Sequence, residues 1–261
     1  MQSWFSDQSR LFVLMALCAM LWSLESVVPL NRYRKHRLRR ALPNIALTAL
    51  LVVTNLLLSF ATAQFVSFAQ SRQLGLLFLI NLSPWLLAVL GIMGLDFFAY
   101  LAHVLLHKSW LGWQFHRVHH SEREVDVTTA FRQHPGETLW RILWQLLAIV
   151  VFGLPLWVVV IYLMISAVNA QLEHANIRIN QPLDRWLRLL LVTPNMHKTH
   201  HSRWQRETDS NYANIFPLWD RLGNTYTAQV DFNKLRFGLD GFDDEAMQTF
   251  RALLKIPFAT K

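Results

Sequence analysis

The chain has 261 residues, 53% of them apolar, and its 25 basic residues outnumber 17 acidic residues, giving a net charge of +8. This length suits one domain, and the apolar content exceeds what a water-soluble core of that size needs. No aromatic-interleaved basic groove or DNA-reading motif accompanies the positive charge, so nucleic acid is not an expected partner. The single cysteine, Cys18, excludes a disulfide framework and a thiolate metal site.

The apolar residues occur in long blocks rather than at regular spacing. Three blocks predict membrane-spanning helices at about 11–30, 45–69 and 76–106, because about 20 helical residues cross a hydrocarbon core. A fourth block, at about 139–172, is broken by Pro155 and should form a kinked span or a re-entrant hairpin. The blocks therefore predict an all-α, multi-pass membrane bundle that forms a single domain over residues 1–261.

A basic run follows the first block and consists of Arg32, Arg34, Lys35, Arg37, Arg39 and Arg40. The positive-inside rule places this run on the cytoplasmic side, and counting spans places the end of the third block there as well. Histidine clusters lie on both sides of the fourth block. If they share one site, that block must enter and leave the membrane on the same side, so we favour a hairpin that turns near Gly153–Pro155.

The two arms of this hairpin are expected to be too short to cross the membrane fully. A cytoplasmic cap is expected to form from residues 107–138 and 176–261. The protein is therefore expected to be an integral, multi-pass membrane protein whose cap carries the histidines on the cytoplasmic side.

Ten of the eleven histidines lie between positions 103 and 201, mostly in the clusters HVLLH, HRVHH and HKTHH. Residues three or four positions apart lie on one helix face, so each cluster directs two or three imidazoles toward one point. His36, in the basic run, is interpreted as an ordinary surface or hydrogen-bonded histidine. The candidate metal ligands are His103, His107, His116, His119, His120, His134, His174, His197, His200 and His201.

Eight to ten imidazoles exceed what one four- to six-coordinate ion can use, so the sequence predicts two metal ions. Imidazole binds iron and zinc alike, and ligand type does not decide between them. A hydrolytic zinc site needs only three protein ligands and a water, so the surplus favours a dinuclear oxidation centre. The alternatives are a dinuclear zinc hydrolase and a membrane metal-binding or transport protein. The transport alternative calls for histidine or acidic residues at mid-span, whereas the histidine clusters lie at helix ends and Asp96 is the only acid inside the third block.

Asp96 precedes His103 by two helical turns on the same helix face. It is predicted to orient a ligand imidazole through the second ring nitrogen, a role that carboxylates often have at metal sites. Asp220 is expected to form an ion pair with Arg221. Weaker candidates for the orienting role, with solvation or helix capping as the alternative, are Asp126, Glu137, Glu173 and Asp209.

The order HVLLH, FHRVHHS, EHAN and TPNMHKTHHS, followed by SNYANIFPLWDRLGNTY, resembles the fatty acid hydroxylase and sterol desaturase superfamily over about residues 96–226. The resemblance implies an integral membrane enzyme with a non-haem di-iron site, O₂ as oxidant, and a sterol, fatty acyl, sphingoid or related lipid as substrate. The eight clustered histidines match the ligand motifs of the superfamily. His134 and His174 lie where its remaining ligands are often found, whereas Ala170 stands where some acyl hydroxylases have a histidine.

The expected reaction is the hydroxylation or desaturation of a lipid, and the expected cofactors are two iron ions, which zinc can replace in isolated preparations. The chain has no haem-attachment, flavin or ferredoxin motif. Electrons are therefore expected from an external donor, such as a reductase with a ferredoxin or a cytochrome b5-like protein.

Overall fold

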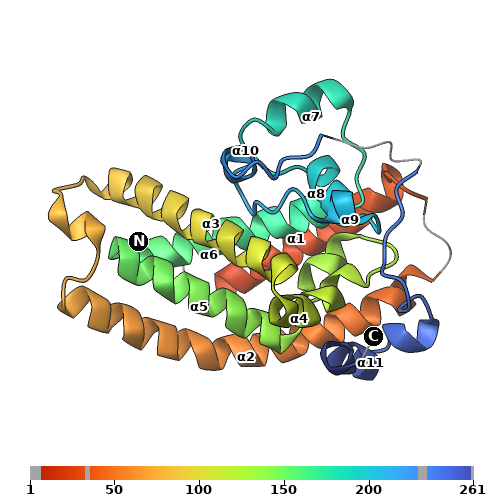
Figure 1. Ribbon diagram of the computed structural model, residues 1–261, viewed down its shortest axis with the longest axis horizontal. Helices are drawn as coiled ribbons and strands as arrows, with labels where there is room; N and C mark the ends of the chain where they lie inside the picture. Colours follow the sequence, from red (N-terminus) through yellow and green to blue (C-terminus); the bar gives the residue numbers. More distant parts are fainter. Residues whose placement is uncertain (1–6, 33–35, 229–233, 260–261) are drawn as a thin grey trace.

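The computed structural model describes residues 7–32, 36–228 and 234–259, and every regular element in these ranges is a helix (Figure 1). This confirms the predicted all-α class. The α-helices are α1 (Asp7–Val27), α2 (Arg37–Ser71), α3 (Pro84–Lys108), α4 (Trp110–His120), α5 (Pro135–Phe152), α6 (Leu156–His174), α7 (Gln181–Leu187), α8 (Pro194–His200), α9 (Gln205–Thr208), α10 (Leu218–Leu222) and α11 (Phe250–Lys255). The 3₁₀ turns are η1 (Leu76–Leu79), η2 (Val127–Phe131), η3 (Glu245–Gln248) and η4 (Ile256–Phe258).

Helices α2, α3, α5 and α6 run along the long axis of the molecule, and α3 packs against both α5 and α6 (Figure 1). The connections α2–α3 and α5–α6 lie together at one end, which we call the turn end. A Cβ atom on Gly75 would lie only 2.1 Å from the backbone nitrogen of Gly153, so the two connections are in close contact there. Helices α4, α8 and α9 lie at the opposite end, which we call the histidine end.

The hairpin between α5 and α6 forms where the sequence predicted it. Gly153 ends α5 in the left-handed conformation with φ of 72°, which glycine adopts without steric cost, and its N–H donates to Ile149 O at 2.8 Å. Pro155 directly precedes the first residue of α6. The reversal therefore uses only three residues, and both arms keep nearly their full length.

Three segments are long and apolar enough to cross a membrane: Arg37–Leu79, Pro84–Lys108 and Leu156–His174. The expectation that both hairpin arms are too short was wrong for α6, whose 19 residues extend for about 28 Å. The predicted block at 76–106 starts before its helix does, because Pro84 begins α3 after the separate turn η1. The apolar part of α1, Leu11–Val27, is shorter than the other three, and its crossing of the membrane stays a prediction.

Small residues allow the central helices to approach closely. A Cβ on Gly91 would lie 2.7 Å from Val158 of α6, and one on Gly94 would lie 2.5 Å from Phe152 of α5. Lipid chains are as apolar as leucine, so van der Waals packing of this kind is what holds helices together inside a membrane. The buried cluster formed by α2, α3, α5 and α6 also includes Ile215, which lies between α9 and α10.

Glu25, the only charged residue in the predicted block at 11–30, joins α1 to the histidine end. Its Oε1 atom accepts hydrogen bonds from the backbone N–H groups of Val127 and Asn176, each at 2.8 Å, and its other oxygen pairs with Arg37. The carboxylate is buried but fully partnered, which makes its burial tolerable. Helix α1 is therefore attached to the same body as the histidine clusters.

Candidate metal centre

Short, well-capped helices present the two HxxHH clusters. Helix α4 begins at a cap in which Ser109 Oγ accepts from the N–H of Gly112 at 3.1 Å. Helix α8 begins after Thr193, whose Oγ1 accepts from the N–H of Met196 at 3.2 Å, and Pro194 occupies its first turn. The other ligands come from the last turns of α3 and α6. All four helix segments meet at the histidine end.

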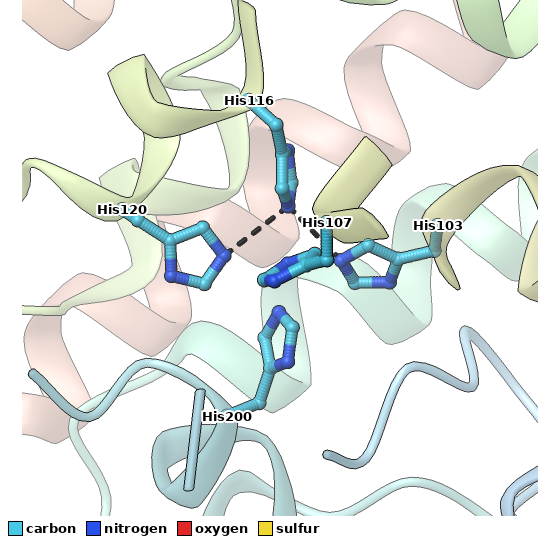
Figure 2. A group of neighbouring side chains, drawn as sticks. All are labelled: His103, His107, His116, His120 and His200. Carbon is cyan, nitrogen blue, oxygen red and sulfur yellow. Dashed lines mark hydrogen bonds between the residues drawn. The ribbon is translucent and has the colours of Figure 1, made fainter. Parts of the chain in front are cut away.

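Five imidazoles form the first cluster, which we call the five-histidine group: His103, His107, His116, His120 and His200. Each offers one nitrogen, and these nitrogens lie within 4.8 Å of one another. The Nε2 atom of His116 lies 3.0 Å from that of His103 and 3.1 Å from that of His120. Figure 2 shows the five rings, contributed by α3, α4 and α8, directed toward one common space.

Four imidazoles form the second cluster, the four-histidine group: His119, His174, His197 and His201. The Nε2 atom of His174 is central to it and lies 3.1 Å from His119 Nε2, 3.0 Å from His197 Nε2 and 3.1 Å from His201 Nε2. This group draws on α4 and α6, on α8, and on the residue that follows α8. The structure thus brings together nine of the ten candidate ligands.

Each HxxHH motif is divided between the two groups. The outer pair of the first motif, His116 and His120, belongs to the five-histidine group, while His119 belongs to the other. The second motif is divided the opposite way: His197 and His201 lie in the four-histidine group and His200 in the five-histidine group. The groups are also in direct contact, since the rings of His120 and His201 stack with centroids 4.7 Å apart.

The charge state of the histidines suits metal ions. Burial, followed by repulsion from neighbouring groups, lowers the pKa of all six histidines on α4 and α8 and at its end well below 6.5, so these imidazoles are neutral. Neutral imidazole is the form that binds a metal. Within the described part of the chain, the buried Nε2 atoms of His107 and His200 have no hydrogen-bond partner. Two adjoining all-nitrogen cages with such unpartnered nitrogens fit two metal ions.

Several ligand rings are oriented by backbone carbonyl groups. Each of these rings uses Nδ1 for the backbone and leaves Nε2 for the centre of its group. A hydrogen bond from Nδ1–H fixes both the tautomer and the ring orientation. The pairs are His103 with Tyr212 O at 2.8 Å, His200 with Ser210 O at 2.8 Å, His174 with Ala170 O at 2.7 Å and His119 with Arg132 O at 3.3 Å.

Carboxylates approach three further ligands, and all of them were weaker candidates in the sequence. The buried Glu137 has Oε1 3.0 Å from His116 Nδ1. Asp209 Oδ1 lies 3.4 Å from His107 Nδ1. The carboxylate of Glu173 lies 3.8 Å from His197 Nε2. Asp126 instead caps η2, where it accepts from the N–H of Thr128 at 2.9 Å.

The prediction that Asp96 orients a ligand imidazole was wrong. Its carboxylate accepts from the N–H groups of Ile215 at 3.1 Å and Phe216 at 3.0 Å, and from the Trp219 indole at 2.9 Å. Seven residues of helix separate Asp96 from His103 by about 10 Å along the axis, which is beyond the reach of a short carboxylate. Asp96 therefore fixes the loop between α9 and α10, the loop that supplies the Tyr212 carbonyl to His103.

Asp220 fixes the same loop through a second set of hydrogen bonds to its backbone. Its two oxygens accept from the N–H groups of Tyr212 at 2.7 Å and Ala213 at 3.0 Å. The expected ion pair with Arg221 was wrong, because Arg221 donates instead to the backbone carbonyl of Arg188 at 2.6 Å. Two buried carboxylates thus hold the backbone that contacts the five-histidine group.

His134 is the one candidate ligand that the structure does not bring into either group. It is the N-cap residue of α5, where its Nδ1 accepts from the N–H of Gly136 at 3.0 Å, and its ring packs against Phe115. Because Nδ1 accepts at the start of α5 and the ring lies in neither group, His134 acts as a capping residue. His36 precedes α2 and lies outside both groups, as expected.

Lys198 is a buried residue of the site that the sequence analysis missed. Its ammonium group donates to the carbonyls of His174 at 3.1 Å and Ala175 at 2.5 Å, which joins α8 to the end of α6. Burial lowers the pKa of Lys198 to about 7. In the sequence, only its position inside the HKTHH motif could have indicated that Lys198 belongs to the site. Backbone acceptors such as Ser210 O and Tyr212 O leave no side-chain signal at all.

Comparisons with known proteins place the histidine clusters inside a known family. The profile of the family described as "Fatty acid hydroxylase" matches residues 88–225, which include all nine clustered histidines. Ornithine lipid hydroxylase OlsE of Rhizobium tropici is 33% identical over 177 residues, covering 66% of this chain and 50% of the relative. Alkylglycerol monooxygenase of Homo sapiens is 31% identical over 160 residues, covering 60% of this chain and 34% of the relative.

The alkylglycerol monooxygenase of Xenopus tropicalis is 30% identical over 159 residues, covering 60% of this chain and 33% of the relative. The chain therefore spans between a third and a half of the length of these relatives. No solved structure was found to match it. The family profile covers more than half of the chain and contains the whole histidine centre, so this protein belongs to the fatty acid hydroxylase family.

Proposed function

We propose that the protein is an oxidoreductase that hydroxylates a lipid with O₂ at a dinuclear iron centre. The observation that carries this proposal is the pair of adjoining all-histidine groups in a chain of the fatty acid hydroxylase family. The relatives are named as hydroxylases and monooxygenases, which are oxidoreductases. A hydrolytic zinc site needs three protein ligands, and nine imidazoles far exceed that number.

The residues of this chain would hold one ion in the five-histidine group and one in the four-histidine group. A bound iron pair supplies the activation of O₂ and the removal of hydrogen from an unactivated C–H bond. The protein keeps the imidazoles neutral by burial and orients them through backbone carbonyls and the carboxylate of Glu137. Burial of the histidines also excludes bulk water from the reacting centre.

The substrate we propose is a polar lipid dissolved in the membrane. The metal groups lie at the ends of apolar helices, where a bilayer lipid can reach them from the side. The names of the relatives, an ornithine lipid hydroxylase and alkylglycerol monooxygenases, favour a polar lipid and favour hydroxylation over desaturation.

We further propose that the histidine end faces the cytoplasm. Arg32 precedes α2, and Arg37, Arg39 and Arg40 lie in its first turn, at the histidine end (Figure 1). The positive-inside rule assigns such a run to the cytoplasm. Arg34 and Lys35 of the same run lie outside the described residues. An external donor on this side, a ferredoxin with its reductase or a cytochrome b5-like protein, would supply the electrons.

A labelling experiment tests this topology. Single cysteines are placed at Arg206 on the histidine end and at Arg72 on the turn end, both exposed, in a Cys18→Ser background. A membrane-impermeant maleimide added to intact cells should label the Arg72→Cys protein and spare the Arg206→Cys protein. The reverse pattern would place the metal centre outside the cytoplasm.

The activity is tested with purified protein that has been stripped of metal and reloaded with either Fe(II) or Zn(II). Iron-loaded protein, given a reductant and a membrane lipid extract, should consume O₂ and produce a lipid that gains one oxygen atom. A product that loses two hydrogens would indicate a desaturase. Full turnover with zinc and without O₂ consumption would refute the proposal and favour a hydrolase.

A further inference from the structure

The segment that connects the ligand His174 to the ligand His197 carries an outward-facing apolar surface. It comprises residues 181–191, that is, α7 and the turn that follows it, and we call it the α7 surface. Trp186 and Leu190 are each 73% exposed. Leu183, Leu187, Leu189 and Leu191 are exposed as well. In Figure 1 this segment projects from the bundle beyond α8 and α10.

Two charged residues of the same segment, Asp184 and Arg188, point inward, whereas Arg185 is exposed. Asp184 is fully buried, pairs with Arg188 one helical turn later, and accepts from the Thr193 hydroxyl at 2.7 Å. A helix on the surface of a water-soluble protein has the opposite arrangement, with its apolar side chains inside. Burying an ion pair under a layer of exposed leucines costs free energy in water. The arrangement becomes favourable when the outer layer contacts an apolar medium.

The α7 surface is linked to the flank of a membrane-spanning helix. Arg221 of α10 donates to the carbonyl of Arg188 at 2.6 Å, which joins α10 to the turn after α7. Trp219 of α10 packs on Phe97 of α3, with ring centroids 5.1 Å apart. Phe97 lies about 20 Å along α3, which is about 37 Å long, so α10 rests against the middle part of this helix. Leu222 of α10 is exposed as well, which extends the apolar surface from α7 toward α3.

Side chains of the kind found at a membrane–water boundary are exposed at the histidine end. Trp110 on α4 and Trp204 before α9 are largely exposed, as is Trp186 on α7. Arg178 and Arg185 are exposed at the edges of the α7 surface, where they can contact lipid phosphates. Tryptophan and arginine are the residues that anchor protein at the level of the headgroups.

We propose that the α7 surface inserts into the lipid bilayer beside α3. The bilayer, and not another protein, is the partner that fits, because the surface is apolar, borders tryptophan and arginine, and continues onto the flank of a membrane-spanning helix. Insertion places bilayer lipid next to the segment between two ligands of the four-histidine group. This proposal does not depend on the reaction that the metal centre performs.

The test uses fluorescence quenching in lipid vesicles. The protein, with Cys18→Ser and one new cysteine at Leu190, is labelled with an environment-sensitive fluorophore and reconstituted alone into phosphatidylcholine vesicles. Leu57→Cys on the exposed face of α2 marks the membrane interior, and Glu245→Cys at the histidine end marks water. All three positions are exposed, so the substitutions leave the packed interior intact. Quenching by phospholipids with brominated acyl chains is compared with quenching by iodide.

The label at Leu190 should resemble that at Leu57, with a ratio of lipid quenching to iodide quenching several-fold higher than at Glu245. A ratio like that of Glu245 would show that the segment faces water and would overturn the proposal. Protection from both quenchers would mean that a second copy of the chain covers the surface, which also overturns it. If the Leu57 label escaped lipid quenching too, the membrane placement of the whole bundle would be wrong.

Discussion

The two histidine groups are built from the same motifs but differ in how completely they surround an ion. The five-histidine group receives two imidazoles from α3, and its rings are braced by Glu137, Tyr212 O and Ser210 O. The four-histidine group receives one imidazole from α6 and no carboxylate at hydrogen-bonding distance. An ion bound in the four-histidine group would therefore keep one more coordination position for an exogenous ligand. The comparison predicts that two bound ions would not be equivalent.

Removal of one ligand from each group should have the largest effect. We expect both His200→Ala and His201→Ala to lower lipid oxidation by more than the roughly 10–100-fold that changes around a metal site typically cost. His200→Ala leaves four imidazoles in its group, whereas His201→Ala leaves three, so His201→Ala should lose more metal. Elemental analysis of the purified variants and O₂ uptake measure the two effects.

The matched control for these variants is His36→Asn, which changes a histidine outside both groups. His36 has φ of 85°, a left-handed conformation that asparagine tolerates. This variant should keep both the metal content and the activity of the wild type. Equal metal loss in His200→Ala and His201→Ala would show that the extra imidazole in the five-histidine group makes no difference.

Replacement of Glu137 by Gln should have the next largest effect, and only on the five-histidine group. Glutamine keeps the shape of the side chain but loses the negative charge 3.0 Å from His116 Nδ1. We expect metal affinity or turnover to fall by about 10–100-fold. A chelator titration should release one of the two ions earlier than in the wild type. Asp126→Asn, which changes a capping carboxylate of η2, serves as the control and should release both ions as the wild type does.

Replacement of Asp96 by Asn tests the loop that braces the five-histidine group. The amide cannot accept every hydrogen bond that the carboxylate accepts from Ile215, Phe216 and Trp219, and a buried unpaired donor costs about 1–3 kcal/mol. We expect a lower unfolding temperature in detergent and a few-fold loss of metal from the five-histidine group. An unchanged unfolding temperature with a 10–100-fold loss of turnover would instead restore the direct orienting role.

Mild acidification should have the smallest effect and should not distinguish the groups. Burial lowers the pKa of the six histidines on α4 and α8 and at its end well below 6.5, three in each group. Metal affinity should therefore change little, by about two-fold at most, between pH 7.5 and 6.5, because the imidazoles stay neutral. Retained metal is measured after dialysis at each pH. Loss from one group alone would contradict the equal burial of the two.

The free energy of unfolding of the metal-free protein should depend on these histidines only below about pH 6.5. Histidines of the unfolded chain take up protons near pH 6.5, whereas those of the folded protein stay neutral to lower pH. The unfolded state then binds more protons, so stability falls as the pH drops below about 6.5 and is independent of these groups above it. Chemical unfolding at pH 7.5, 6.5 and 5.5 measures this dependence.

Local sequence patterns were sufficient to predict the helical class, the Gly153–Pro155 turn and nine clustered histidines, because each depends on spacing within one helix. The partners of Asp96 could not be predicted in this way. They lie about 120 residues further along the chain, on a loop whose backbone N–H groups leave no signal in the sequence. His134 shows the same limit: its residue type suited a ligand, but its place before Pro135 made it a cap.

The division of the histidines into two groups was also beyond the sequence. HRVHH and HKTHH have the same spacing, and only the opposed packing of α4 and α8 decides that His119 and His200 each belong to the other group. The expected length of α6 was too short because the predicted block ended at about residue 172, whereas α6 continues to His174 and has 19 residues.

The divided motifs have a consequence for how the centre is assembled. Helices α4 and α8 have only 11 and 7 residues, and each contributes histidines to both groups, so neither can rotate without moving both groups. The first ion to bind would order both helices and would thereby lower the entropy cost of binding the second. Loading of the wild-type protein should therefore be cooperative, and a wild-type chain that carries a single ion should be a minor species.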